Sequence, residues 1–315
     1  MNLFLLIIGL LGLWVGTEIT VRHALRLAAT LGLSPMFVGL TILAIGTDLP
    51  ELVLSIEAGL QRLIGVETSG LVIGNAIGSS LGQIGFALGV TGLVGYVMLG
   101  RRQAWIDGVT LIGSIAIFFL LGADGEFTRT DGVILITVYL IYFATAIKRE
   151  QFGKPKREPG AARVGIKIGF YCFFGILMVT ASSHLAILSA VALAEEWGIP
   201  QTFIGIVLLG VGTSLPELAV SVNAALKKQG ALSVGNILGS NIFDMLVAPG
   251  SAAALAGLSI ESMSMFKIDL LALLIISLLA LFFFRRRKGL QKGEALTLVV
   301  IYSAYITART LWVGA

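Results

Sequence analysis

Ten apolar stretches run through the chain, and each is long enough to cross a lipid bilayer as a helix. About 20 apolar residues cover the hydrocarbon core. The stretches lie at residues 3–24, 34–60, 70–98, 104–122, 131–148, 165–192, 200–226, 232–257, 267–284 and 294–313. Only 13% of the residues are charged, against about a quarter in soluble domains. The sequence predicts an all-α, polytopic membrane protein in contact with the lipid bilayer. Nucleic-acid binding and secreted disulfide-bonded scaffolds are excluded.

The basic residues predict the orientation of these helices. A cytoplasmic position for segment 149–163 places on the cytoplasmic side all of the 22 lysines and arginines except Arg62, Arg129, Lys267 and Arg309. Cytoplasmic loops of membrane proteins carry such an excess of positive charge. We therefore expect a multi-pass protein of the cell membrane with both termini extracytoplasmic. Segment 149–163 is the predicted linker between two five-helix repeats, residues 1–148 and 164–315.

The two halves contain a duplicated block. Gly32–Leu60, GLSPMFVGLTILAIGTDLPELVLSIEAGL, aligns without a gap with Gly198–Leu226, GIPQTFIGIVLLGVGTSLPELAVSVNAAL, and 13 of 29 positions are identical. A second block follows in each half, GNAIGSSLGQ at Gly74–Gln83 and GNILGSNIFD at Gly235–Asp244. Because five spans separate the copies, the second copy enters the membrane from the opposite side. The sequence thus predicts ten transmembrane helices in two inverted repeats.

The first blocks place acids and prolines in the middle of apolar spans. Asp48 and Glu51 flank Pro50 in one half, and Glu217 follows Pro216 in the other. A carboxylate in the middle of a bilayer costs about 2.5 kcal/mol or more, so it is expected to face a cavity or a cation. Each proline also breaks the helix and frees a carbonyl oxygen one turn earlier. Carboxylates, hydroxyls and carbonyls are the oxygen ligands that hard cations such as Ca²⁺ and Na⁺ prefer.

The second blocks add small residues and further oxygen atoms. Glycines recur at helical spacing in both copies, which lets another helix approach closely; they are Gly74, Gly78, Gly82, Gly85, Gly235 and Gly239. Ser79 and Ser240, with Gln83 and Asp244 one turn later, project oxygen atoms from these helices toward the same centre.

These motifs resemble the cation/Ca²⁺ antiporter superfamily, and within it the prokaryotic sodium/calcium exchangers. The resemblance covers the whole chain and rests on two copies of G-T-x-L-P-E followed by G-N-x-x-G-S. It implies a secondary antiporter, not an enzyme, that exchanges Ca²⁺ or a similar divalent cation for Na⁺ by alternating access without a cofactor. It also implies that Glu51 and Glu217 are the central metal ligands. Further ligands would be Thr47, Thr213, Ser214, Ser79, Ser240 and Asp244, with carbonyls near Ala44 and Gly210.

The first half departs from the family pattern at four positions. Asp48 stands where the family usually has Ser, Ser80 where it has Asn, Gly82 where it has Phe, and Gln83 where it has Asn or Asp. The predicted cavity would then hold four acids, Asp48, Glu51, Glu217 and Asp244. The extra acid could bind an additional cation, or it could stay protonated because crowded like charges raise a pKa.

Other functions remain open at this stage. The driving ion could be H⁺ instead of Na⁺, or transport could depend on K⁺, and a cation channel could use the same carboxylates as a selectivity ring. A hydrolase could use Asp48 with Asp244 as a catalytic pair, although the acids lie in duplicated ion-ligand motifs. No nucleotide-binding G-x-x-x-x-G-K-[ST] motif occurs. We expect inorganic cations as the only soluble ligands and no obligate protein partner.

Overall fold

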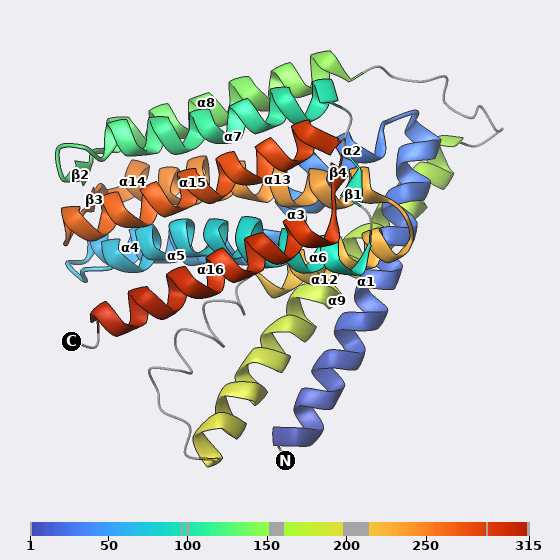
Figure 1. Ribbon diagram of the computed structural model, residues 1–315, viewed down its shortest axis with the longest axis horizontal. Helices are drawn as coiled ribbons and strands as arrows, with labels where there is room; N and C mark the ends of the chain where they lie inside the picture. The colour runs from blue at the N-terminus through green and yellow to red at the C-terminus, as the bar shows by residue number, and fades with distance from the viewer. Residues whose placement is uncertain are drawn as a thin grey trace.

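The chain folds into a bundle of helices (Figure 1). This computed structural model describes residues 2–95, 97–98, 101–150, 161–197, 214–287 and 289–313. Within those ranges, six helices are long and apolar enough to cross a membrane, or seven if one bent pair counts as a single span. The all-α membrane fold is confirmed, whereas the count of ten spans stays a prediction.

Helices occupy described parts of all ten apolar stretches. The first half contains α1 (Asn2–Leu31), α2 (Pro35–Val38), the π-helical η1 (Gly39–Leu43), α3 (Ala44–Thr47), α4 (Leu49–Leu63), α5 (Ser69–Leu81), the π-helical η2 (Gly82–Ala87), α6 (Leu88–Val94), α7 (Arg101–Leu121) and α8 (Arg129–Arg149). The second half contains α9 (Ala161–Glu196), α12 (Leu215–Leu226), α13 (Gly230–Leu246), α14 (Ala248–Ala256), α15 (Met263–Arg287) and α16 (Lys292–Val313). Most of the predicted linker 149–163 lies outside the described residues.

Two short β-ribbons tie the halves together at opposite ends of the bundle (Figure 1). In one ribbon, β1 (Val97–Met98) pairs with β4 (Gly289–Leu290), and in the other, β2 (Glu126–Phe127) pairs with β3 (Leu258–Ser259). Both are antiparallel, with Val97 opposite Leu290 and Leu258 opposite Phe127. Val97 and Leu258 lie at the same distance from the start of their second repeated block. Each half therefore gives the other the same strand contact, as an inverted repeat requires.

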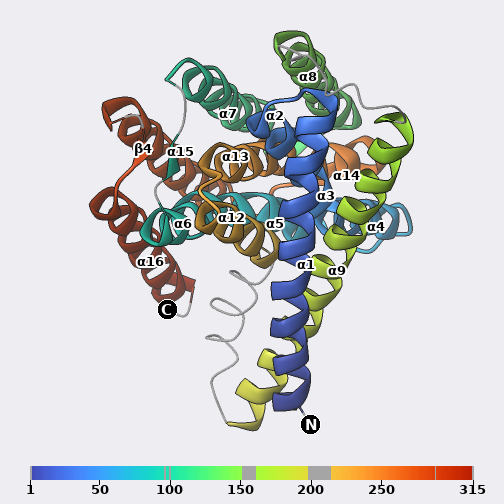
Figure 2. The ribbon, with the colours of Figure 1, turned by 90° about the vertical axis from the view of Figure 1, so that its right-hand side faces the viewer.

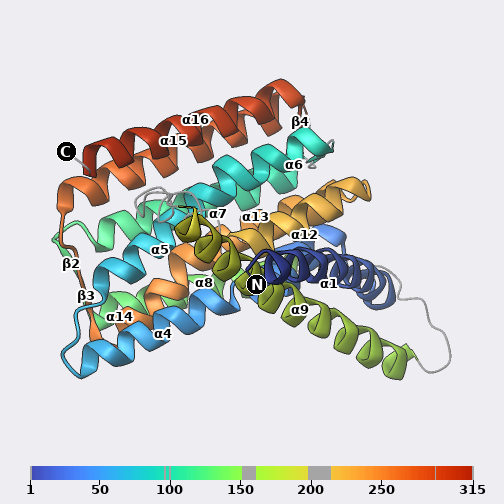
Figure 3. The same ribbon diagram turned by 90° about the horizontal axis from the view of Figure 1, so that it is seen from below.

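Helices α1 and α9 lie side by side and cross the rest of the bundle at a steep angle (Figure 2). Gly9, Gly12 and Gly16 of α1 face α9, where an added Cβ at Gly9 would lie 2.8 Å from the backbone nitrogen of Ala186. The two backbones therefore approach closely along a seam of small residues. Figure 3 shows α15 and α16 on the side of the bundle away from this pair.

The most buried helices, α13 and α14, form the centre of the core. In the most apolar 18-residue stretch of Gly230–Ala256, 89% of the residues are buried, whereas 33% are buried in the corresponding stretch of α1. Here η1 of the first half crosses α13 of the second at glycines. A Cβ added to Gly39 would lie 2.4 Å from the Leu232 oxygen, and one added to Gly235 would lie 2.4 Å from the Met36 oxygen. The expected close approach is thus found at this crossing.

The glycines of the first half do not share one partner. Gly85 faces Tyr302 of α16, whose Cβ would lie 2.6 Å from an added methyl group, whereas no described atom comes within 4 Å of one at Gly74 or Gly78. The expected thin surface is found where Gly85 of η2 meets α16.

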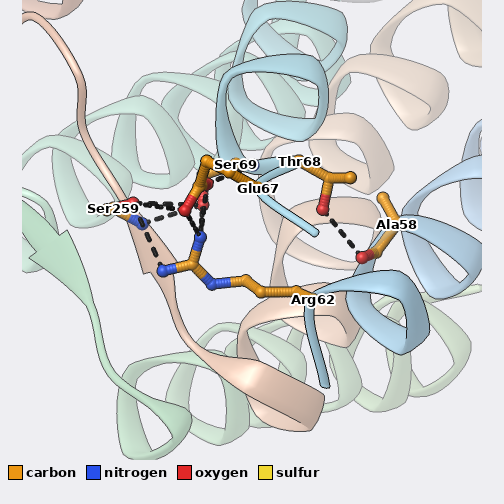
Figure 4. Close-up of polar contacts among 6 residues, drawn as sticks. All are labelled: Ala58, Arg62, Glu67, Thr68, Ser69 and Ser259. Carbon is orange, nitrogen blue, oxygen red and sulfur yellow. Dashed lines mark hydrogen bonds and ion pairs between the residues drawn. The ribbon is translucent and has the colours of Figure 1, made fainter. Parts of the chain in front are cut away.

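A polar cluster fastens the turn between α4 and α5 to β3 (Figure 4). Arg62 donates to both carboxylate oxygens of Glu67, to Ser69 Oγ at 2.5 Å and to Ser259 Oγ at 3.2 Å. The backbone N–H of Ser259 donates to Ser69 Oγ at 3.0 Å. The hydroxyl and N–H of Ser69, followed by the Arg62 guanidinium, lower the pKa of Glu67 to about 2. This cluster joins the two halves at the end that carries β2 and β3.

We expect Gly235→Ala to destabilise the protein. The new methyl group would also lie 3.0 Å from the backbone nitrogen of Leu40, so η1 would have to move away from α13. Overpacking of this kind costs about 1–3 kcal/mol, which thermal unfolding in detergent detects as a lower Tm. Gly113→Ala is the matched control, because Gly113 lies inside α7 with no described atom within 4 Å of an added Cβ. Equal Tm values for the two variants would contradict the close crossing.

We expect Glu67→Gln to lower the Tm at pH 7, with an effect that depends on pH. The folded pKa of Glu67 lies below the ordinary value of 4.5, so its ionised form stabilises the fold above that value. This contribution is lost as pH falls from 4.5 toward about 2. The Tm difference from the wild type should therefore narrow between pH 5 and pH 3, and it is small because the side chain is 52% exposed. Glu126→Gln, an exposed acid in β2, should show no such narrowing.

Candidate ion-binding site

In each repeat a helix begins at the duplicated L-P-E sequence. The helix axis bends by 46° between Pro35–Thr47 and Leu49–Leu63. The residue between them, Asp48, has φ −86° and ψ 5°. The equivalent Ser214, directly before α12, has φ −90° and ψ 12°. The following Pro50 and Pro216 lack the N–H that would continue the helical hydrogen bonds. The duplicated L-P-E sequence therefore produces the same local backbone twice.

Acids from the two repeats converge at these breaks. One carboxylate oxygen from each of Asp48, Glu51 and Glu217 lies within 4.8 Å of the others. Asp48 and Glu217 are 0% exposed and Glu51 is 4% exposed. The structure thus brings Glu51 and Glu217 together, as the inverted repeat predicts, and adds Asp48 to them.

These carboxylates have no compensating donors. Among the described residues, no hydrogen-bond partner reaches either oxygen of Asp48 or Glu217, or Oε2 of Glu51. Burying an unpaired charge is costly, so a group of three acids is favourable here only with cations or protons among them. Ca²⁺ binds carboxylate oxygens at about 2.3–2.6 Å, and two ligands on opposite sides of such an ion are about 4.8 Å apart. The spacing of the acids suits one such cation.

Hydroxyl groups surround the acids. Ser79 Oγ lies 3.4 Å from Ser214 Oγ, and Ser214 also donates to the Ser79 carbonyl at 3.3 Å. Thr47 Oγ1 donates to the Leu43 carbonyl at 3.1 Å and to that of Ala44 at 3.3 Å. The Ala44 carbonyl also accepts the N–H of Asp48 at 3.0 Å.

The remaining predicted ligands are distributed as follows. Ser240 is 0% exposed, and its hydroxyl has no partner among the described residues. Gln83 and Asp244 lie together, because Gln83 Nε2 donates to Asp244 Oδ2 at 3.1 Å and to Ser79 Oγ at 3.1 Å. Thr213 and Gly210, also predicted as ligands, lie outside the described residues.

The chain matches one family over nearly its whole length. The model of the family described as sodium/calcium exchanger protein covers residues 1–148 and 167–311. This chain belongs to the sodium/calcium exchanger family. The family is one of multi-pass membrane transporters, which also fits the apolar helices.

Known exchangers and membrane proteins are similar to this exchanger from end to end. Sodium/calcium exchanger MaX1 of Methanosarcina acetivorans is 29% identical over 97% of each chain. Inner membrane protein YrbG of Escherichia coli is 26% identical over 93% of this chain and 92% of its own. A solved structure of the sodium-calcium exchanger NCX_Mj, soaked with Na⁺, is 27% identical and has a TM-score of 0.83 over 97% of this chain and 98% of its own. Other structures of NCX_Mj come from soaks with Ca²⁺ or Sr²⁺.

The sequence analysis missed two pairs of polar residues beside the acids. Asn236 Nδ2 donates to Ser221 Oγ at 3.2 Å and to the Glu217 carbonyl at 3.5 Å. In the other half of the exchanger, Nδ2 of Asn75 and Oγ of Ser55 are buried without a partner among the described residues. Both pairs are identical in the aligned blocks, so the duplication carried a signal for them.

A cavity of about 240 Å³ reaches Glu51 on the side of the break that faces the β2–β3 end. Its described lining comes from α4, α5, α9 and α12 and consists of Pro50, Glu51, Leu54, Asn75, Thr180, Ser183, His184, Ile187 and Pro216. On the opposite side of the site, α1 packs against α12. There Glu18 binds Lys227 at 2.8 Å and Arg22 at 2.9 Å, and Asn223 Nδ2 donates to Thr17 Oγ1 at 3.5 Å.

The two sides differ at residues related by the same offset of 166 positions as the first aligned blocks. Ser183 lines the cavity with a hydroxyl that has no described partner, whereas the equivalent Thr17 is in contact with α12. The described residues thus form a cavity at Glu51 on one side of the site, and an ion pair and a hydrogen bond join α1 to α12 on the other.

Proposed function

We propose that this chain is a secondary antiporter that exchanges Ca²⁺ for Na⁺ across the cell membrane. The observation that carries the proposal is the convergence of buried, unpartnered carboxylates from two inverted repeats. Membership of the sodium/calcium exchanger family and similarity to exchangers over the full chain support it. The ions are the substrates, and the chain uses its own oxygen atoms to hold them.

The central ligands in this proposal are Glu51 and Glu217. Hydroxyl and carbonyl oxygens complete the site, from Thr47, Thr213, Ser214, Ser79, Ser240, Ala44 and Gly210. A Ca²⁺ ion and Na⁺ ions need the same oxygens, so binding of one displaces the other. This competition couples inward movement of Na⁺ to outward movement of Ca²⁺.

Alternating access would follow from movement of the α1–α9 pair against the rest of the bundle. In the present conformation the cavity gives access to Glu51, and the contacts of α1 with α12 hold these helices together on the other side. When these two roles exchange, the ion site faces the opposite compartment. Movement with bare carboxylates is slow, because uncompensated charge would cross an apolar seal.

The β1–β4 end is the cytoplasmic end in this proposal. Arg285 and Arg286 at the end of α15 precede β4, and Arg101 and Arg102 at the start of α7 follow β1. Positive charge is enriched on the cytoplasmic side. The cavity at Glu51 then faces outward, and both termini are extracytoplasmic.

We expect Glu217→Gln to abolish exchange. The amide keeps the shape of the side chain but removes a charge from the ion site, and loss of one partner in a buried charge interaction costs about 3–5 kcal/mol, or more than about 100-fold in affinity. The measurement is ⁴⁵Ca²⁺ uptake into proteoliposomes driven by an imposed Na⁺ gradient. Glu57→Gln, an exposed acid on the same side of the membrane in α4, should transport normally. Normal uptake by the Glu217 variant would refute the site.

We expect Glu18→Gln to shift the exchanger away from the conformation described here. The substitution removes the ion pair with Lys227, in which the two side chains are 34% and 28% exposed. Such pairs contribute up to about 1 kcal/mol, so the ratio of outward-open to inward-open molecules should fall by up to about fivefold. Labelling of Ser183→Cys by an impermeant thiol reagent from outside measures this ratio, because native Cys172 is buried. Arg22→Gln is the control, and unchanged labelling in the Glu18 variant would contradict the seal.

A further inference from the structure

Each repeat contributes two of the four buried acids Asp48, Glu51, Glu217 and Asp244, but at different positions. In the alignment Asp48 is equivalent to Ser214, and Gln83 is equivalent to Asp244. The first half therefore places both acids on its broken helix, as Asp48 and Glu51. The second half places one on α12, as Glu217, and one on α13, as Asp244. The duplication alone does not say which three or four of these acids touch the ion.

Asp48 has the position and the freedom of a ligand. It is 0% exposed, neither of its oxygens has a hydrogen-bond partner among the described residues, and one of them lies within 4.8 Å of oxygens of Glu51 and Glu217. Its backbone is fixed, because Asp48 is both the C-cap of α3 and the N-cap of α4. The helix break fixes the backbone of Asp48, and both carboxylate oxygens are without a hydrogen-bond partner among the described residues.

Asp244 is held differently, by a chain of amides with only one possible orientation. The Ile237 carbonyl can only accept, so the group of Asn241 that contacts it at 2.7 Å is the NH₂ group. That NH₂ group also donates to Gln83 Oε1 at 2.7 Å. The other side of the Gln83 amide, Nε2, therefore faces Asp244 Oδ2 and Ser79 Oγ and uses both of its hydrogens there.

This chain of hydrogen bonds distinguishes Asp244 from Asp48. Its Oδ2 accepts from an amide N–H₂ group, which cannot bind a cation, and only Oδ1 has no partner among the described residues. Asp244 belongs to no group of three converging acids in the part of the chain that the structure describes. The amide donors compensate part of its charge, whereas neither oxygen of Asp48 accepts a hydrogen bond from a described residue.

We propose that Asp48 supplies the third anionic ligand of the transported divalent cation, while Gln83 holds Asp244 outside the coordination shell. The inference rests on the proposed exchange function and assigns ion selectivity within that site. Three carboxylates around one position favour a divalent over a monovalent cation, because each unit of ligand charge gains more from the doubly charged ion. Asp48 therefore sets the Ca²⁺ to Na⁺ preference of this chain.

Calorimetric titration of the purified, detergent-solubilised protein with CaCl₂ tests this assignment. Asp48→Asn, which keeps the side-chain volume, should weaken Ca²⁺ binding by at least about tenfold. Asp244→Asn should weaken it by less than about threefold, since the amide oxygen still accepts from Gln83. Asp48→Ser is the second variant at that position, because the equivalent Ser214 adopts the same backbone conformation. Addition of NaCl should displace bound Ca²⁺ from the Asp48→Ser variant at about a tenfold lower concentration than from the wild type.

The outcomes separate this inference from the proposed function. Equal or greater loss of Ca²⁺ affinity in Asp244→Asn would overturn the assignment, and so would unchanged affinity in both Asp48 variants. If the wild type binds Ca²⁺ with the expected order of variants but shows no Na⁺-driven ⁴⁵Ca²⁺ uptake in proteoliposomes, exchange fails and the role of Asp48 stands. If the folded wild type binds no Ca²⁺, both are wrong.

Discussion

Uncompensated negative charge in an apolar interior is the constraint on which this structure depends. One oxygen from each of three carboxylates lies within 4.8 Å of the others where the two halves meet, and five of their six oxygens have no hydrogen-bond partner among the described residues. A folded protein tolerates such a group only if a mobile cation or a proton shares it. The site is consequently stable when a cation or proton is bound. Its occupancy determines which movements of the surrounding helices are energetically possible.

The duplication provides the geometry of this site, and the differences between the copies provide its chemistry. Asp48 and Ser214, which directly precede α4 and α12, have nearly the same backbone angles. Asn75 and Asn236 are identical in the two copies, yet one Nδ2 is unpartnered beside a cavity and the other is bonded to Ser221. The same two residue types therefore have different surroundings in the two halves, so a duplicated sequence adopts an asymmetric conformation.

The sequence predicted the all-α membrane fold, the broken helices and the meeting of Glu51 with Glu217, because each has a strong local signal that is repeated. It could not predict contacts that depend on how the halves pack. The β-ribbons are two residues per strand and have no periodicity to detect. The amide chain from Ile237 through Asn241 to Gln83 joins two repeats, and no motif relates its members. The spacing of Gly9, Gly12 and Gly16 indicates that a helix packs closely against α1. Because several helices are rich in glycine, this spacing alone does not identify α9 as that helix.

The reciprocal β-ribbons have a mechanical consequence. Each ribbon pairs a strand of one half with a strand of the other, and the two ribbons lie at opposite ends of the bundle. These connections hold the helices around the ion site together as one unit. The described parts of α1 and α9 are not joined to either ribbon. In the proposed exchange the ion can then stay at a constant depth in the membrane while the α1–α9 pair moves past it. Only a small part of the protein has to move in each transport step.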